Sequence, residues 1–523
     1  MRRNHLAAAA AYTQVAANYA SWNHTGVWRS ELLENTLALV GSSISSVSGG
    51  SKRTTARNCN PRRILHVMTE AYGVGGHTRF VWRWMEMDST RAHSLALTSQ
   101  GRRDVPAPLA KSVAAAGGEL YYLDRQGGGL QSHARHLRQL AGDFDLIVLH
   151  LHPFDVVPAL AFLPKEERAP IIQVNHSDHL FWIGQSVPDV VANIRESGRE
   201  LAITLRGLPA EQNGIIPIPL GTIQRKRSRS EAKKQLGLDE NQVALCTIAT
   251  KYKFEPIFGE VPFVDCVLPV LKEHRNAVLF VVGPNASGQW EKGVLHSEGR
   301  MRVCGSLPDP SLYFEAADIY LDPFPVGSLT SALEAGLYGA PVVCYCPFIR
   351  EAAVLSPDSP GVSSEMVRCF DLEKYRRTLG DLIVDEARRT SIGKRMQVSV
   401  SASHIGVNWF GFVEDAYAQA TRESSASVQR SSSAAPVRAE ILDIRLSELH
   451  EKEGEHRDSN EVIRYHIGTF PLSYRLRLWI TLFHGRLTLL PRVLMPEWAR
   501  DSVRGFLRRC ASRFSRLKLR NSI

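Results

Sequence analysis

The 523-residue chain lacks any run of about 18 consecutive apolar residues, the length that an α-helix needs to cross a bilayer. We therefore expect no membrane-spanning helix. Hydrophobic residues make up 44% of the chain and charged residues 22%, a balance typical of a soluble globular protein. The length is sufficient for two domains with extensions.

Cysteine is scarce, and its spacing does not indicate a metal site. The chain has eight cysteines, and no pair has the Cys-x-x-Cys spacing of zinc or redox motifs. Cys344 and Cys346 would share one face of a strand, but further zinc ligands are missing from their surroundings in the sequence. We therefore expect reduced, buried thiols in a cytoplasmic protein and no metal cofactor.

Net charge is nearly absent outside residues 471–523. The whole chain has a formal net charge of +10, and residues 471–523 contain 12 Lys or Arg against two acidic residues, a surplus of 10. The rest of the protein is therefore close to neutral. This distribution argues against a general nucleic-acid-binding protein.

The basic C-terminal segment has the pattern of an amphipathic helix. Residues 498–519 place an apolar stripe beside several arginines, formed by Val503, Phe506, Leu507, Cys510, Phe514 and Leu517. A basic helix of this kind suits an anionic membrane surface, with the protein peripheral on the inner face of the membrane. The alternative is a helix that packs on its own domain or on a partner protein.

The first residues imitate a signal peptide. Arg2 and Arg3 precede an alanine-rich stretch, but Tyr12, Gln14 and Asn18 interrupt the apolar core that export requires. We therefore expect residues 1–61 to form a surface helix or a partly disordered extension. Residues 41–55 are rich in Ser and Gly and predict a linker.

Buried strand patterns alternate with amphipathic helical stretches along most of the chain, which predicts an α/β fold with two facing Rossmann-like domains. In the first domain, residues 62–223, we expect strands at 64–68, 95–98, 120–123, 145–150, 171–175 and 201–204. In the second domain, residues 243–402, we expect strands at 243–248, 277–283, 301–305, 319–322 and 341–345. The remaining predicted segments are a solvated linker at 224–242, a crossover helix at 403–420, a flexible linker at 421–440 and a helical basic tail at 441–523.

The most informative stretch is residues 312–345, where a Pro/Gly turn joins a buried strand to a helix. The helix begins with short hydroxyl side chains, and its first N–H groups have no partner within the helix. Such a helix end suits a phosphate. Glu334 lies one turn further along the same face, where it suits a ribose. We interpret the stretch as a nucleoside diphosphate cradle formed by Gly327, Ser328, Thr330, Ser331 and Glu334; the alternative is an ordinary βαβ unit.

These residues carry a family resemblance. The segment ADIYLDPFPVGSLTSALEAGLYGAPVV resembles the donor-binding segment of GT-B glycosyltransferases, particularly the O-linked N-acetylglucosamine transferase type and the broad family 4 and family 1 group. The resemblance implies that Thr330 and Ser331 hold the pyrophosphate and that Glu334 holds the ribose. Val326 stands where many retaining enzymes of this fold have a carboxylate, so both inverting and retaining chemistry remain open.

A glycine-rich turn follows the first predicted strand. Gly73, Gly75 and Gly76 allow a ligand to approach the backbone, and His77 begins the next helix. The spacing is not that of a dinucleotide fingerprint, and strand 95–98 does not end in the required acidic residue. The turn resembles instead the first loop of GT-B enzymes, which faces the donor. The alternative for His77 is a surface residue at a helix start.

Polar clusters follow two predicted strands of the first domain, at residues 150–155 and 175–182. Because ligands bind at the carboxyl ends of strands in open α/β sheets, we expect His176, Asp178 and His179 to face the interdomain cleft. A histidine there can bind a sugar hydroxyl or accept a proton, with a carboxylate as base or as its partner. The stretch resembles the sugar-facing histidine loop of GT-B transferases. The alternative is a hydrogen-bonded histidine pair that stabilises the loop.

Two lysines follow the first strand of the second domain. Lys251 and Lys253 would present ammonium groups at the carboxyl end of that strand, where they suit a phosphate leaving group. The tetrad at 252–255 resembles the transferase segment whose lysine contacts the donor diphosphate, which favours Lys253. Two solvated lysines are the alternative.

Together these features predict a glycosyltransferase that moves a sugar from a nucleotide sugar to an acceptor hydroxyl, without a metal. His176, His77 and Asp178 are the candidate bases if the reaction inverts the anomeric centre. The alternatives are a non-catalytic GT-B scaffold protein of polysaccharide assembly and a nucleotide-sugar epimerase of the same fold. The sequence does not identify the sugar, the base or the acceptor.

Overall fold

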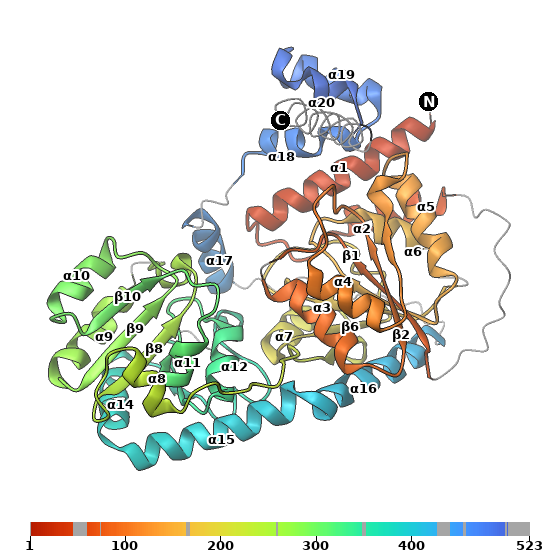
Figure 1. Ribbon diagram of the computed structural model, residues 1–523. Coiled ribbons are helices and arrows are strands. Elements are labelled where there is room, and N and C mark those ends of the chain that lie inside the picture. The colour runs from red at the N-terminus through yellow and green to blue at the C-terminus, as the bar shows by residue number, and fades with distance from the viewer. Residues whose placement is uncertain are drawn as a thin grey trace, which may run out of the picture.

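The computed structural model of the protein describes residues 2–44, 60–73, 75–163, 168–257, 260–347, 352–425, 440–452, 457–496 and 499. These residues form two α/β units joined by long helices (Figure 1). The predicted amphipathic helix at 498–519 lies outside the described residues, apart from residue 499. The same is true of most of the predicted linkers at 41–55 and 421–440.

The first unit is built on a parallel seven-stranded sheet with the order β3-β2-β1-β4-β5-β6-β7. Its strands are nearly continuous buried runs, as expected when helices cover both faces of a sheet. The strands are β1 (Arg63–Met68), β2 (Ala92–Leu97), β3 (Leu120–Tyr122), β4 (Leu146–His150), β5 (Ile171–Asn175), β6 (Val190–Asn193) and β7 (Asn213–Ile215). The helices that follow them are α3 (Gly76–Met87), α4 (Ala107–Ala115), α5 (Leu130–Ala141), α6 (Val156–Phe162) and α7 (Glu196–Thr204).

The predicted strand at 201–204 is wrong. These residues end helix α7, whose buried face is formed by Ser197, Gly198 and Ala202, and the missing strand is β6. A four-residue apolar run is too short for its period to distinguish a helix from a strand. The sheet order therefore continues through β6 to β7 rather than through residues 201–204.

The second unit has a parallel six-stranded sheet with the order β10-β9-β8-β11-β12-β13. Its strands are β8 (Val243–Ile248), β9 (Ala277–Val282), β10 (Met301–Gly305), β11 (Ile319–Leu321), β12 (Val342–Tyr345) and β13 (Val367–Cys369). Its helices are α8 (Arg229–Gln235), α9 (Phe263–Glu273), α10 (Gln289–His296), α11 (Ser311–Ala316), α12 (Leu329–Leu337), α14 (Leu372–Val384) and α15 (Glu386–His404). In both sheets the order in which successive strands are added reverses beside the first strand, between β1 and β4 and between β8 and β11. Ligands bind at such switch points in doubly wound folds.

The segment between the two units is attached to the second one rather than solvated. Arg225 donates hydrogen bonds to the carbonyls of Glu315 and Tyr338, and Arg227 pairs with the Glu315 carboxylate at 2.9 Å. Glu315 is fully buried. The basic residues of this segment therefore neutralise a buried acid, and a capping box at Ser228 begins α8.

The N-terminal helices α1 (Arg2–Trp22) and α2 (Glu31–Ser42) belong to the first unit (Figure 1). Leu37 and Val40 of α2 are fully buried in the core that surrounds α6. The Glu34 carboxylate accepts hydrogen bonds from the backbone N–H groups of Gly184, Gln185 and Ser186. The described part of the predicted extension is therefore integral to the domain and is not a surface appendage.

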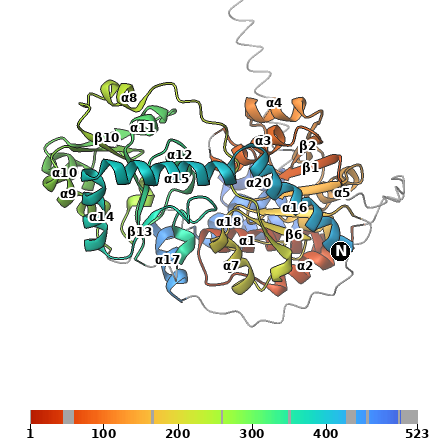
Figure 2. The same ribbon diagram turned by 90° about the horizontal axis from the view of Figure 1, so that it is seen from below.

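Helices at the C-terminal end connect the two units. Helix α15 runs along the second unit, and α16 (Gly406–Ser425) crosses to the first sheet (Figure 2). Helix α17 (Glu440–Lys452) lies between the units, and α18 (Ser459–His466) packs on α1, followed by α19 (Leu472–Thr481) and α20 (Leu490–Leu494). None of the helices in the described ranges combines the length and apolar character that a bilayer crossing requires.

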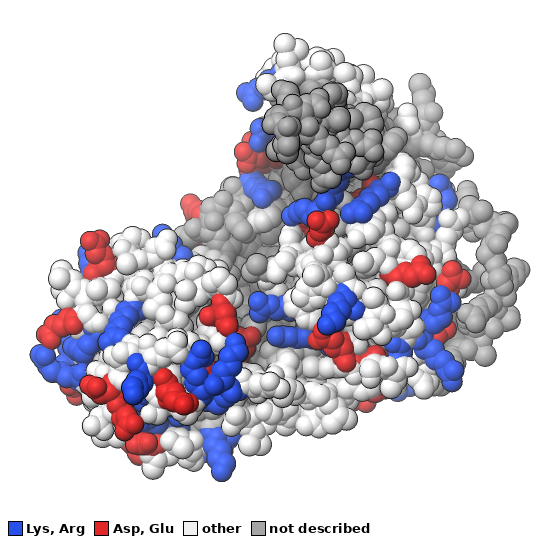
Figure 3. Space-filling view, in the orientation of Figure 1, with Lys and Arg blue, Asp and Glu red and all other residues white. Residues whose placement is uncertain are grey.

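Charges of both signs are interspersed over the two units. On the face shown in Figure 3, basic and acidic side chains alternate and do not gather into one patch. This distribution agrees with the near-neutral balance of the sequence outside residues 471–523.

Candidate functional site

The loop after β11 and the loop after β8 meet at the start of α12. The Lys253 ammonium donates a hydrogen bond to the Gly327 carbonyl at 2.8 Å, and the Val326 N–H donates to the Lys253 carbonyl at 3.3 Å. Helix α12 starts after Ser328, whose side chain does not cap it. The first N–H groups of α12 and the Lys253 ammonium therefore lie at one place, as a diphosphate would require.

Asp322, at the end of β11, supports this loop. Its carboxylate accepts a hydrogen bond from the Ser328 N–H at 3.0 Å, and burial raises its pKa to about 7. A Cβ on Gly327 would lie 2.7 Å from the Asp322 carboxylate and 2.9 Å from Pro357, so only glycine fits. Sequence reasoning missed Asp322 as a functional residue, although the Leu-Asp strand end was part of the resemblance.

The start of α3 in the first unit faces the start of α12 in the second. A Cβ on Gly76 would lie 3.9 Å from the Thr330 hydroxyl, and Gly75 has a φ of 118° with open space beside it. Glu334 lies within electrostatic range of Arg83 and Arg79 on α3; burial raises its pKa, and these two cations oppose the shift. Gly76 and Thr330 therefore lie close together across the two units, with Glu334 further along α12 near Arg79 and Arg83.

Other predicted donor residues divide into two groups. The Ser328 hydroxyl donates to the Ser331 hydroxyl at 3.1 Å, so this pair is partly engaged within the helix start. The Lys251 side chain is 69% exposed and pairs loosely with Glu255 at 3.8 Å. Lys251 is therefore a surface residue, as the alternative interpretation expected.

His77 and His176 lie side by side. Their ring centroids are 4.4 Å apart in an edge-to-face arrangement. Burial lowers the pKa of His77 to about 3 and holds the pKa of His176 well below its usual value. The His77 Nε2 atom is buried and has no hydrogen-bond partner among the described residues. Both imidazoles are therefore neutral near pH 7.

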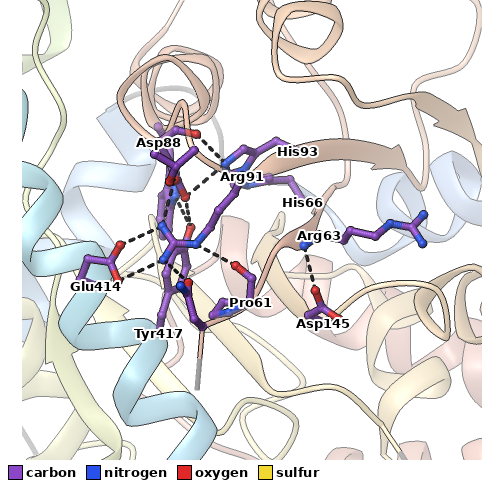
Figure 4. A network of polar contacts seen from close by, with 12 residues as sticks. Pro61, Arg63, His66, Asp88, Arg91, His93, Asp145, Glu414 and Tyr417 are labelled. Atoms are coloured by element: carbon purple, nitrogen blue, oxygen red, sulfur yellow. Dashed lines mark hydrogen bonds and ion pairs between the residues drawn. The ribbon is translucent and has the colours of Figure 1, made fainter. Parts of the chain in front are cut away.

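His176 is the end of a chain of four hydrogen-bonded imidazoles. His176 Nε2 lies 3.0 Å from His150 Nδ1, His150 Nε2 lies 3.0 Å from His66 Nδ1, and His66 Nε2 lies 3.0 Å from His93 Nδ1. His93 Nε2 then meets the Asp88 carbonyl at 3.1 Å and its carboxylate at 3.2 Å (Figure 4). The chain therefore crosses the sheet from Asp88 to the cleft.

Strand register explains this diagonal path. His93 of β2 pairs with Ile64 of β1, two residues before His66, and His150 of β4 pairs with Met68, two residues after His66. From one histidine to the next, the hydrogen-bonded chain therefore moves to the neighbouring strand and two residues further along it. An offset of two residues keeps every ring on the same face of the sheet. Sequence reasoning missed His66, His93 and Asp88, because histidines inside buried runs give no sign of their neighbours.

Asp88 is held ionised at the far end of the chain. Burial acts to raise its pKa, but hydrogen bonding from His93 and the charge of Arg91 keep it below the usual value. The Arg91 guanidinium lies 3.0 Å from the Asp88 carboxylate and 2.8 Å from that of Glu414 on α16 (Figure 4). Tyr417 also donates to Asp88 at 3.0 Å.

Asp178 does not join the two cleft histidines as an available base. Its carboxylate makes two hydrogen bonds with the Arg195 guanidinium, at 2.5 and 2.8 Å, and a third with His179 at 3.1 Å. Asp178 is 1% exposed, and although burial acts to raise its pKa, Arg195 holds it far below the usual range. Asp178 and His179 therefore stabilise the loop, while the Asp178 charge favours protonation of nearby His176.

The described residues contain no group of three His, Cys, Asp or Glu side chains arranged to hold a metal ion. The groups that could neutralise a diphosphate are instead Lys253 and the N–H groups of α12.

Comparison with known proteins identifies the fold. No protein-family model matches the sequence, and no curated protein matches it. Among solved structures, the Anabaena protein HepE (Alr3699) in complex with UDP is 15% identical, with a TM-score of 0.51 over 68% of this chain and 98% of that chain. A glycosyltransferase from Rickettsia africae is 9% identical, with a TM-score of 0.51 over 71% of this chain and 100% of that chain. The chain therefore has the GT-B fold, as the sequence predicted.

Proposed function

We propose that the protein is a glycosyltransferase that transfers a sugar from a nucleoside diphosphate sugar to an acceptor hydroxyl. The observation that carries this proposal is the meeting of Lys253 with the start of α12, directly opposite Gly76. The shared fold of HepE, whose structure contains UDP, adds support. The fold alone does not specify a reaction, so the argument rests on the residues of the cleft.

Charge develops on the diphosphate as the sugar leaves. The Lys253 ammonium, the first N–H groups of α12 and the Thr330 hydroxyl would stabilise this charge, because all are fixed before the reaction begins. Glu334, between α12 and α3, would accept hydrogen bonds from the ribose. Ser331 would contribute to the diphosphate site through Ser328, whose hydroxyl is hydrogen-bonded to the Ser331 hydroxyl.

The imidazole chain would make His176 a base. The carbonyl and the carboxylate of Asp88 can only accept hydrogen bonds, so His93 Nε2 must carry a proton and donate it. His93 Nδ1 then accepts from His66, and the same orientation passes through His150 to His176 Nε2. His176 Nδ1 is left with a lone pair. An inverting transfer needs such a lone pair to take the proton of the acceptor hydroxyl.

His77 would assist from the first turn of α3. Its buried Nε2 has no partner among the described residues, and its ring touches that of His176. A substrate hydroxyl that reaches this nitrogen would satisfy it. We therefore assign His77 to positioning the acceptor or the donor sugar and His176 to proton removal.

Two lysines of one loop provide the test. The Lys253→Ala variant should bind UDP at least tenfold more weakly, because it loses a charge-assisted contact of about 1.5–3 kcal/mol. The matched Lys251→Ala variant should bind UDP as the wild type does, because Lys251 is exposed. Thermal shift and calorimetry with UDP and a panel of nucleotide sugars measure both. Equal loss of affinity in both variants, or no UDP binding by the wild type, would contradict the cradle.

Product analysis separates this function from its alternatives. A transferase should release UDP from the donor that binds, and the His176→Ala variant should bind that donor but release UDP at least a hundredfold more slowly. Binding without UDP release in the wild type would favour a scaffold protein. Conversion of the free nucleotide sugar to an epimer would favour an epimerase.

A further inference from the structure

A cavity of about 570 Å³ lies in the first unit, and His152 is part of its lining. Residues that follow strands of the first sheet form its floor, and α1, α18 and the residues around α19 form its opposite wall. Its volume falls within the range of about 300–1,000 Å³ that is typical of small-molecule sites. The N-terminal and C-terminal helices therefore close a space at the ligand-binding edge of the sheet.

The cavity adjoins the proposed base. His152, in its lining, has its ring centroid 6.0 Å from that of His77, and His77 contacts His176. Burial lowers the pKa of His152 to about 4, so this residue is neutral near pH 7. The cation near His152 is Arg103, which is paired with Glu70, so a molecule in the cavity can present an uncharged end to the histidines.

Three carboxylates line the cavity, and all are engaged: Asp124 accepts a hydrogen bond from the Gly101 N–H, and Asp155 and Glu70 have the partners given next. Asp155 accepts hydrogen bonds from Thr69 at 2.8 Å and from the Val157 N–H at 3.0 Å. Glu70 pairs with Arg103 and accepts a hydrogen bond from Tyr72 at 2.8 Å. These acids therefore have little capacity left to pair with other cations of the cavity.

Three other arginines of the cavity lining have side chains without such partners. Arg475 on α19 is 5% exposed, and its Nε and Nη1 atoms are buried without a hydrogen-bond partner among the described residues. Burial lowers the pKa of Arg475. Arg102 and Arg135 also line the cavity, and within the described ranges neither has a hydrogen bond or ion pair. An unpaired guanidinium in a protein interior lowers the stability of the fold. The lining therefore lacks an anion that would pair with Arg475.

Polar and aromatic side chains complete the lining. Gln14 and Gln131 provide amides, and Phe154 and Tyr465 provide flat apolar faces. This combination suits a sugar ring, which has hydroxyls at its edge and C–H groups on its faces. We propose that the cavity binds the acceptor, and that the acceptor is a saccharide with a phosphate or carboxylate group that pairs with Arg475. This inference rests on the proposed function, because it makes the bound saccharide the acceptor.

Binding of simple anionic sugars to the full chain tests the site without turnover. Glucose 6-phosphate and glucuronate are the probes for the two anions, glucose is the neutral control, and inorganic phosphate tests for binding of the anion alone. We expect one of the anionic sugars to bind at least tenfold more tightly than glucose and than inorganic phosphate. Which sugar binds identifies the anion.

Two arginines of α19 form a matched pair of variants. Arg475→Met should abolish the preference for the anionic sugar, whereas Arg477→Met, on the exposed side of the same helix, should keep it. Arg475→Met should also melt at the wild-type temperature or above, because it removes an unpaired buried charge. Arg135→Gln should weaken the same binding and provides a second test if Arg475→Met does not fold.

The outcomes separate this inference from the proposed function. Equal affinity for anionic and neutral sugars, or an anion preference that survives in both Arg475→Met and Arg135→Gln, overturns the acceptor site. UDP binding that depends on Lys253 would stand in either case. Conversely, an Arg475-dependent preference for an anionic sugar in a protein that does not bind UDP would support the site and refute its role as the acceptor site of a transferase.

Discussion

The imidazole chain makes a specific prediction for His93→Leu. His93 is fully buried, and leucine has nearly the same volume, so the change removes the acceptor for His66 and the donor to Asp88 with little change in packing. His66 Nε2 would then carry a buried proton without an acceptor. If His66, His150 and His176 each carry their proton on the other ring nitrogen, the unpaired N–H of His66 becomes an unpaired lone pair. An unpaired buried lone pair costs less free energy than an unpaired buried N–H. His176 would then present an N–H to the cleft.

The magnitude follows from one hydrogen bond. To act as a base, the variant must restore the original orientation and leave one buried donor unsatisfied, at a cost of about 1–3 kcal/mol. The rate of transfer should therefore fall about 5- to 150-fold, while affinity for UDP stays unchanged. Imidazole ¹⁵N chemical shifts should show the proton of His176 on Nε2 in the wild type and on Nδ1 in the variant.

Ser94→Ala is the matched control for His93→Leu. Ser94 is the next residue of β2 and accepts a partly buried hydrogen bond from the Glu119 N–H at 3.0 Å. Its loss should cost similar stability without affecting the tautomers, because neighbouring residues of a strand lie on opposite faces. The reasoning is refuted if His176 keeps its proton on Nε2 in His93→Leu, or if Ser94→Ala slows the reaction equally.

Two further predictions concern stability. Burial lowers the pKa of three histidines to about 3 or 4, namely His77, His152 and His466. Below about pH 6.5 the unfolded chain therefore binds more protons than the folded chain. Each of these histidines should lower the free energy of unfolding by about 1.4 kcal/mol at pH 5.5 relative to neutral pH. A melting temperature that does not fall between pH 7 and pH 5.5 would contradict this. Gly198→Ala should destabilise the fold by about 1–3 kcal/mol, because its Cβ would lie 2.7 Å from the Asp178 carboxylate; Gly221→Ala, with open space beside it, is the control in the same denaturant titration.

The sequence predicted the architecture well where runs of apolar residues were long and bounded by glycine or proline. The strands and helix of the α12 region lie within one or two residues of their predicted limits. The strand predicted at 201–204 was wrong because a run of four residues fits the period of a helix as well as that of a strand. The choice between helix and strand depends there on contacts with β6 and β7.

The candidate site was predictable only in part. Lys253, Gly76 and Thr330 were expected from their loops and from the family resemblance, and the structure brings them together. Residues 66, 93 and 88 could not be connected in advance, because their contact depends on strand order and register. Arg475 could not be placed either, since its position depends on how α18 and α19 pack on α1.

Helix α17 has a consequence for substrate exchange. Its Asp443 accepts hydrogen bonds from His24 and Trp28 of the first unit at 2.7 and 3.1 Å, and its Arg445 pairs with Glu260 of the second at 2.6 Å. Its leucines pack against both sides. Any separation of the two units must first break the contacts of α17 with one of them. In the proposed transferase, a segment more than a hundred residues from the α12 loop in sequence would therefore control how readily donor and product pass between the units.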